Sequence, residues 1–214
     1  YDDVPAALED NYYVRTKQEA ERLVVAARGD LPNATIHRVG AVVFAAEGDV
    51  LQRNIDSNAF FRQLAWFIRL GAAPDDLDLW PCHVDLTARA AATLAQSAGL
   101  ANTIHHIEPA SRGGFADFIA AGPDMEHVRA VDFGGFLDRL DQAAADPALE
   151  TAVTGAVEMF GLLSGVAPQA RRGRLEVATE RTRLLLGALG FSWPDRLPAA
   201  GLARMLRAAA THVS

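Results

Sequence analysis

The only lysine of this 214-residue chain, Lys17, follows Tyr13 by four residues in the run Tyr13-Val14-Arg15-Thr16-Lys17. On a helix, residues four apart share a face, so the phenol and the ammonium would project side by side. A free phenol has a pKa of about 10 and is a poor acid at neutral pH, but a neighbouring ammonium favours the phenolate and lowers that pKa. The pair therefore predicts proton transfer to a carbonyl group that receives hydride, with Tyr13 as the proton donor.

Arginine supplies every other strongly basic side chain, since Lys17 is the one lysine among 20 Lys and Arg residues. Lysine presents three mobile N–H donors that can reach ribose hydroxyls, whereas the arginine fork is planar and rigid. The alternative is an amphipathic helix on which Tyr13 packs and Lys17 is solvated. Because a lysine occurs only at position 17 and arginine is used everywhere else, the catalytic interpretation is favoured.

The elements that would position this pair follow from apolar periodicity and from the Gly and Pro positions. Ser57 and Asp85 are expected to cap helices, and Gly71 to end the first of them; Asp85 could instead orient an active-site loop. The expected elements are a helix over 11–28, strands over 34–39 and 41–44, a helix over 57–71, a strand over 81–84, a helix over 85–97, a strand over 103–108, a helix over 115–120, a strand over 127–131 and helices from 136 onward.

Helices alternate with short strands through the first 131 residues, as in parallel α/β sheets, so the fold class predicted is α/β. The remaining residues, 132–214, are expected to form a mainly helical lobe. The sequence contains no glycine-rich strand–turn–helix unit, with which a doubly wound nucleotide-binding fold should start. We therefore expect a half of the fold to be missing here, either removed or carried by another polypeptide.

Composition argues against several classes of partner and site. The net charge of −7 leaves no basic field to attract nucleic acid. The single cysteine, Cys82, excludes an internal disulfide and a cysteine-rich metal site, and fits a reducing, cytoplasmic compartment. His105 and His106 would point to opposite faces of a strand, so they cannot easily share a metal. We expect no metal site and no membrane span, because the longest apolar stretch, 151–167, is short and contains Glu158.

The Tyr13–Lys17 run, with Ala20-Glu21 after it, resembles the active-site helix of extended short-chain dehydrogenases/reductases. Further segments, in the same order, resemble the thioester reductase domains of nonribosomal peptide and polyketide synthetases and of carboxylic acid reductases. These segments are Thr35-Ile36-His37-Arg38-Val39-Gly40, Leu70-Gly71-Ala72-Ala73-Pro74, Pro81-Cys82-His83-Val84-Asp85-Leu86-Thr87-Ala88-Arg89-Ala90, Ile104-His105-His106-Ile107, Thr182, Leu185, Leu189-Gly190 and Trp193-Pro194. Val39 and Phe136 stand where many members of the family have proline and tryptophan.

The resemblance implies the C-terminal portion of a Rossmann-like extended short-chain reductase fold. Residues 1–131 would be the remnant of the catalytic domain, with substrate-lobe insertions near 45–80. Residues 132–214 would be a helical subdomain that binds the substrate and the carrier protein. The family's glycine-rich half and its Ser/Thr catalytic partner would precede Tyr13, so we expect this chain alone to be inactive.

The activity implied is NADPH-dependent reductive release of an acyl or peptidyl chain from a carrier-protein phosphopantetheine thioester, giving an aldehyde or an alcohol. Tyr13 and Lys17 would be catalytic, and Tyr13, Lys17, Val39 and Gly40 would contact NADPH. The partners would be the carrier protein with its phosphopantetheine arm and the upstream half of the same reductase. Two alternatives remain: a non-catalytic module that only docks a carrier protein, and another extended short-chain reductase or epimerase acting on a small or sugar-nucleotide substrate.

Overall fold

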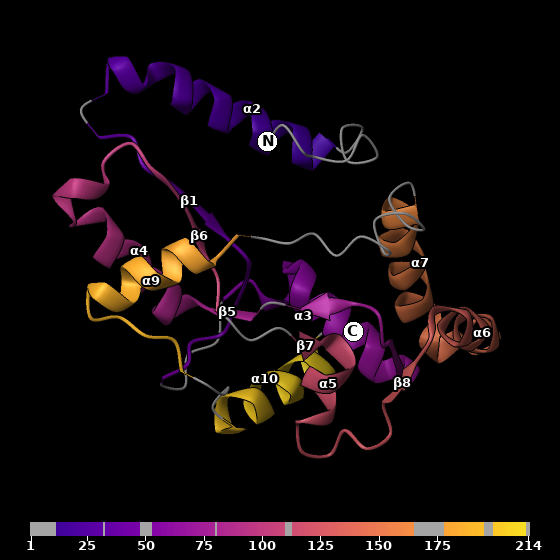
Figure 1. Ribbon diagram of the computed structural model, residues 1–214. Coiled ribbons are helices and arrows are strands. Elements are labelled where there is room, and N and C mark those ends of the chain that lie inside the picture. Colours follow the sequence, from indigo (N-terminus) through magenta and orange to yellow (C-terminus); the bar gives the residue numbers. More distant parts are fainter. Residues whose placement is uncertain are drawn as a thin grey trace. The chain divides into compact units, whose positions relative to one another are not determined.

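The structure is a computed structural model that describes residues 12–31, 33–47, 53–79, 81–109, 113–164, 178–194 and 199–212 (Figure 1). The chain divides into two compact units, each built from segments that are distant in sequence. Unit 1 consists of Tyr1–Val39, Ala88–Ile107 and Gly161–Ser192, and unit 2 of Gly40–Thr87, Glu108–Phe160 and Trp193–Ser214. The sequence-based division into residues 1–131 and 132–214 is a division by function, into a catalytic and a substrate-binding part. It stays a prediction.

Unit 1 contains two parallel strands, β1 (Ile36–Val39) and β6 (Ile104–Ile107), which pair with Ile36 opposite Ile104 and Val39 opposite Ile107. Helix α2 (Tyr12–Ala26) runs into the short 3-10 helix η1 (Ala27–Gly29) ahead of β1. Helix α9 (Glu180–Ala188) packs on β6. The backbone N–H of His106 donates to the Thr182 hydroxyl of α9 at 3.2 Å, which fixes this helix to the strand.

Unit 2 has helix α3 (Ala59–Leu70) at its core, with Phe61, Leu64 and Phe67 wholly buried. The α3 helix begins after Asn58, whose side chain accepts hydrogen bonds from the N–H groups of Phe60 and Phe61, so the cap expected at Ser57 is wrong by one residue. The helix ends as predicted at Gly71, whose positive φ of 66° is the left-handed conformation that favours glycine.

Short strands and further helices surround α3 in unit 2. Strand β2 (Ala41–Val43) pairs in parallel with β5 (Pro81–His83), β3 (Ala72–Pro74) pairs in parallel with β8 (Arg129–Val131), and β4 (Asp78–Leu79) pairs antiparallel with β7 (Gly113–Gly114). The helical segments are η2 (Ile55–Ser57), α5 (Phe115–Ala120), α6 (Phe133–Ala143), η4 (Pro147–Leu149), α7 (Glu150–Ser164) and α10 (Ala199–His212).

Two further elements complete the described chain. Helix α4 (Val84–Ala95) begins in unit 2 and continues into unit 1, where the 3-10 helix η3 (Ala98–Leu100) follows. Three of the four strand pairs formed by the described residues are parallel, so the predicted α/β class is confirmed. Within the same residues, no helix is both long enough and apolar enough to cross a membrane.

Candidate active site

The predicted Tyr13–Lys17 pair lies near the beginning of α2, so the helix that the motif requires is present. Lys17 is exposed, whereas the side chain of Tyr13 lies outside the part of the chain whose side chains are described. One helical turn after Lys17 comes Glu21, whose side chain is only 15% exposed. The contacts of Glu21 therefore show how the helix that carries the motif is attached within unit 1.

An ion pair ties α2 to β1. Nε and Nη2 of Arg38 donate to the Glu21 carboxylate oxygens at 3.0 and 2.7 Å, and the Arg38 side chain is 25% exposed. A planar guanidinium fork matches a carboxylate in this bidentate way. Because Arg38 precedes Val39, the ion pair holds the motif helix against the strand end where a predicted cofactor contact lies. Two segments that carry the family resemblance are thus joined directly.

The third nitrogen of the guanidinium group, Nη1 of Arg38, lies 3.0 Å from Nε2 of His106 on β6. Arginine has no acceptor, so His106 accepts at Nε2 and carries its proton on Nδ1. Burial and the charge of Arg38 lower the pKa of His106, while Glu21 raises it. Glu21, Arg38 and His106 therefore form one polar network. Sequence reasoning did not predict this network, because its members are 17 and 68 residues apart.

The neighbouring His105 has a separate environment. It is almost wholly buried, and its Nε2 lies 2.6 Å from the Thr103 hydroxyl. Burial, followed by the charges of His37 and Arg181, lowers the pKa of His105. The adjacent histidines His105 and His106 on β6 thus make different contacts. In the described residues, no group of three or more His, Cys, Asp or Glu side chains could hold a metal ion.

Gly40 follows β1 at a point of close approach. A Cβ placed on Gly40 would lie 3.0 Å from Sγ of Cys82 and 3.2 Å from Cγ and Oε1 of Glu108. Glu108 follows β6 as Gly40 follows β1, and the two strands are parallel, so both residues leave the carboxyl ends of their strands. Ligands of open α/β sheets bind at such ends. Glu108 is therefore a candidate site residue that sequence reasoning missed, and its place as the last residue of the strand expected over 103–108 was the available signal.

Cys82 is fully buried beside these two residues. Burial raises the pKa of its thiol to about 12, the charge of Glu108 acts in the same direction, and a hydrogen bond with the Gly40 backbone opposes them. The thiolate is the nucleophilic form of cysteine. Cys82 is therefore protonated at neutral pH and packs rather than reacts.

Exposure is known for some of the residues predicted to contact NADPH. Val39 is 40% exposed, although it is apolar and lies at the end of β1. Gly40 beside it has no side chain, and Lys17 of α2 is exposed for contact with hydroxyl groups. The assignment of Tyr13, Lys17, Val39 and Gly40 to catalysis and cofactor contact stays a prediction.

Asp85 differs from its expected role as a helix cap. It lies inside the first turn of α4, and its carboxylate accepts hydrogen bonds from the backbone N–H groups of Ala46 at 2.8 Å and Glu47 at 3.0 Å. Burial tends to raise its pKa, but these bonds and one from Leu86 N–H lower it overall. The cap assignment is wrong because the carboxylate holds the loop after β2; that this loop belongs to an active site stays a prediction.

Comparisons with known proteins agree with this architecture. No protein-family profile matches the chain, and no curated protein sequence does so either. Among solved structures, a thiolation-reductase di-domain from an archaeal non-ribosomal peptide synthetase aligns with TM-score 0.71 and 23% identity, over 97% of this chain and 41% of that one. The terminal R domain of the myxalamid PKS-NRPS pathway aligns with TM-score 0.69 and 23% identity, over 94% of this chain and 50% of that one.

A third structure, the reductase domain of a nonribosomal peptide synthetase from Mycobacterium tuberculosis, aligns with TM-score 0.61 and 19% identity, over 91% of this chain and 49% of that one. This chain has the fold of part of a reductase domain. It spans half or less of the length of the solved structures that it matches. The resemblance that the sequence motifs indicated is confirmed at the level of the fold.

Proposed function

We propose that this chain is part of an NADPH-dependent reductase that releases an acyl or peptidyl chain from a carrier-protein phosphopantetheine thioester as an aldehyde or alcohol. The observation that carries the proposal is the Glu21–Arg38 ion pair. It joins the Tyr13–Lys17 helix to the strand that ends in Val39, inside a fold shared with reductase domains of peptide synthetases. One of those structures also contains a thiolation domain, which supports a carrier protein as the partner.

The proposed chemistry assigns one task to each residue. When bound, NADPH supplies the hydride that reduces the thioester carbonyl carbon. Tyr13 donates a proton to the carbonyl oxygen as negative charge develops there. Lys17 lowers the pKa of this phenol and binds the nicotinamide ribose. The resulting hydroxyl group then loses its proton as the carbonyl re-forms and the carbon–sulfur bond breaks, the phosphopantetheine thiolate takes up a proton, and an aldehyde is released; a second hydride from NADPH and a second proton would give the alcohol.

Arg38 and Glu21 act as positioning residues. The ion pair fixes the rotation of α2 relative to β1, so that the motif helix faces the strand end. Val39 and Gly40 provide the surface beside the nicotinamide. Catalysis depends on such alignment, because small displacements of a catalytic group cost orders of magnitude in rate.

The test uses a polypeptide that joins this chain to a glycine-rich nucleotide-binding half and measures NADPH oxidation with an acyl carrier-protein thioester. Tyr13→Phe keeps the ring but removes the proton donor, so kcat should fall by roughly 10²–10⁴-fold with NADPH affinity little changed. Tyr12→Phe is the matched control, because Tyr12 is the adjacent residue and is 78% exposed. Near-normal turnover in Tyr13→Phe would remove Tyr13 from the mechanism. Carrier-protein binding without NADPH oxidation would support a docking module instead.

A further inference from the structure

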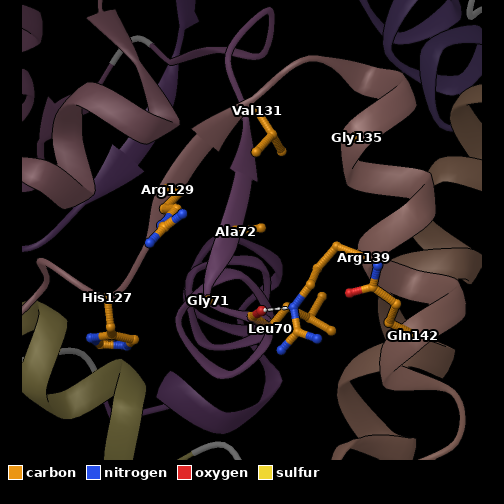
Figure 2. Close-up of a pocket in the computed structure, with 9 residues that line it drawn as sticks. All are labelled: Leu70, Gly71, Ala72, His127, Arg129, Val131, Gly135, Arg139 and Gln142. Atoms are coloured by element: carbon orange, nitrogen blue, oxygen red, sulfur yellow. Dashed lines mark hydrogen bonds between the residues drawn. The ribbon is translucent and has the colours of Figure 1, made fainter.

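A solvent-open pocket of about 370 Å³ lies in unit 2 at the carboxyl end of α3, and none of the residues assigned above to catalysis or cofactor contact lines it. In Figure 2 the chain from Leu70 to Ala72 passes through the middle of the pocket, with His127 and Arg129 on one side and Arg139 and Gln142 of α6 on the other. Pockets of a few hundred Å³ accommodate small organic ligands. Gly71 has no side chain and Ala72 only a methyl group, so they leave this space open.

The charged side chains that line the pocket are all basic. They are Arg129 and Arg139, with the titratable His127 beside them, in a chain whose net charge is −7. Among the described residues, neither Arg129 nor Arg139 has an acidic side chain within ion-pair distance.

Asp132, between the pocket residues Val131 and Gly135, caps α6. Its carboxylate accepts a hydrogen bond from the Gly135 backbone N–H at 2.8 Å. Within the described chain, the positive charge of the pocket is therefore not neutralised by an ion pair.

Arg139 is held in place by the backbone of α3. Its Nε donates to the Leu70 carbonyl oxygen at 2.6 Å, a group at the helix end that has no partner within the helix. Nε2 of His127 lies 3.3 Å from the Ile68 carbonyl oxygen in the same turn. The Arg139 fork is thereby oriented before any ligand arrives, while its two terminal nitrogens can still donate. Such preorganisation reduces the entropy lost on binding.

We propose that this pocket binds the phosphate group of a small organic phosphate monoester. The guanidinium groups of Arg129 and Arg139 donate to the phosphate oxygens from opposite sides of the Leu70–Ala72 segment (Figure 2). A phosphate presents three oxygens in different directions, which suits two forks that approach from two sides better than a planar carboxylate does. Val131 and Ala72 provide apolar contact for the organic part of the ligand.

Isothermal titration calorimetry of the chain with phenyl phosphate, inorganic phosphate and benzoate, at low ionic strength, tests the proposal without NADPH or a thioester. We expect saturable binding of phenyl phosphate at one site, with weaker binding of inorganic phosphate and of benzoate. Arg129→Gln and Arg139→Gln should each weaken phenyl phosphate binding at least roughly tenfold, since each loses a charge-assisted pair. Arg53→Gln is the matched control, because Arg53 is an exposed arginine of the same unit outside the pocket, and it should bind normally.

Arg139 also contacts the backbone, so thermal melting of each variant is compared with that of the wild type. Arg129 makes no side-chain hydrogen bond with another described residue, so Arg129→Gln keeps the test valid if Arg139→Gln fails to fold. Unchanged phenyl phosphate binding in Arg129→Gln would overturn the proposal, as would the absence of saturable binding up to about 10 mM ligand. Benzoate binding as tight as that of phenyl phosphate would overturn the assignment to phosphate. Because no reductase activity is measured, these outcomes are independent of the proposed function.

Discussion

Glu21→Gln should destabilise unit 1, because it removes the carboxylate charge to which the half-buried Arg38 donates. Arg38 donates to both oxygens of the Glu21 carboxylate, and the two side chains are 25% and 15% exposed. Exposed ion pairs contribute at most about 1 kcal/mol, and breaking a fully buried pair costs about 3–5 kcal/mol. The intermediate burial of this pair, with one hydrogen bond retained by the glutamine oxygen, predicts a loss of about 2 kcal/mol in the free energy of unfolding.

A double-mutant cycle isolates the contribution of the pair. Arg38→Met should also destabilise the protein, while the double variant should lose less than the sum of the two, giving a coupling energy of about 1–2 kcal/mol. The same helix provides a control in the Arg22–Glu19 pair, whose side chains are 69% and 63% exposed and whose charged atoms are 3.9 Å apart. Glu19→Gln should change the free energy of unfolding by less than about 0.5 kcal/mol.

Urea denaturation followed by circular dichroism measures these energies, and an NMR titration of His106 provides a local readout. Glu21 raises the pKa of His106 and Arg38 lowers it. Glu21→Gln should therefore lower the pKa of His106 further, and Arg38→Met should raise it. A coupling energy below about 0.3 kcal/mol together with an unchanged titration would refute the network and the positioning role built on it.

Three further predictions concern pH, packing and the catalytic lysine. Stability should fall between about pH 7.5 and pH 5, because burial is the main cause that lowers the pKa values of His37, His105 and His106 in the folded chain, so that the unfolded chain binds more protons in this range; urea midpoints that rise on acidification would contradict it. Gly155→Ala should lower the melting temperature by an amount equivalent to about 1–3 kcal/mol, since its Cβ would lie 2.3 Å from the Trp66 ring, whereas Gly187→Ala meets nothing within 4 Å and should be neutral or stabilising; equal shifts would show that α7 does not pack on Trp66. In the joined reductase, Lys17→Arg and Lys17→Met should both lose activity near neutral pH, and the apparent acidic pKa of the pH–rate profile should rise in Lys17→Met; three similar profiles would mean that Lys17 is a surface residue.

Local signals predicted most of the elements. Helix α5 begins and ends where the sequence pattern placed it, and Gly71 ends α3 because a left-handed residue there requires glycine. The cap of α3 was misassigned by one position, since Ser57 and Asn58 are both good capping residues and only the backbone geometry distinguishes them. Asp85 was misassigned for a different reason. Besides the adjacent Leu86, its partner N–H groups lie 38 and 39 residues earlier, where no local pattern identifies them.

The same distinction applies to the candidate site. The Tyr13–Lys17 spacing is informative because four residues on a helix fix a shared face by local geometry alone. The contacts of Arg38 with Glu21 and His106 depend instead on where Glu21 of α2 lies relative to β1 and on the register of β1 against β6. A single sequence does not specify a parallel register, because many residues separate the two strands.

The predicted site residues differ in how well their substitution would test the proposed function. Gly40 fits a cofactor contact, but the close approach of Cys82 and Glu108 already requires glycine there, whatever is bound. Loss of activity in a Gly40 variant would therefore follow from crowding alone and would not distinguish a reductase from a protein that only shares its fold. Variants of Tyr13 and Lys17 do not have this ambiguity. Tyr13→Phe preserves the ring and Lys17→Arg preserves the charge, so a loss of activity would report on the proposed chemistry rather than on crowding. Activity measurements on the Tyr13 and Lys17 variants of α2 are therefore the decisive test of the proposed reduction. The packing around Gly40 explains only why glycine is required after β1.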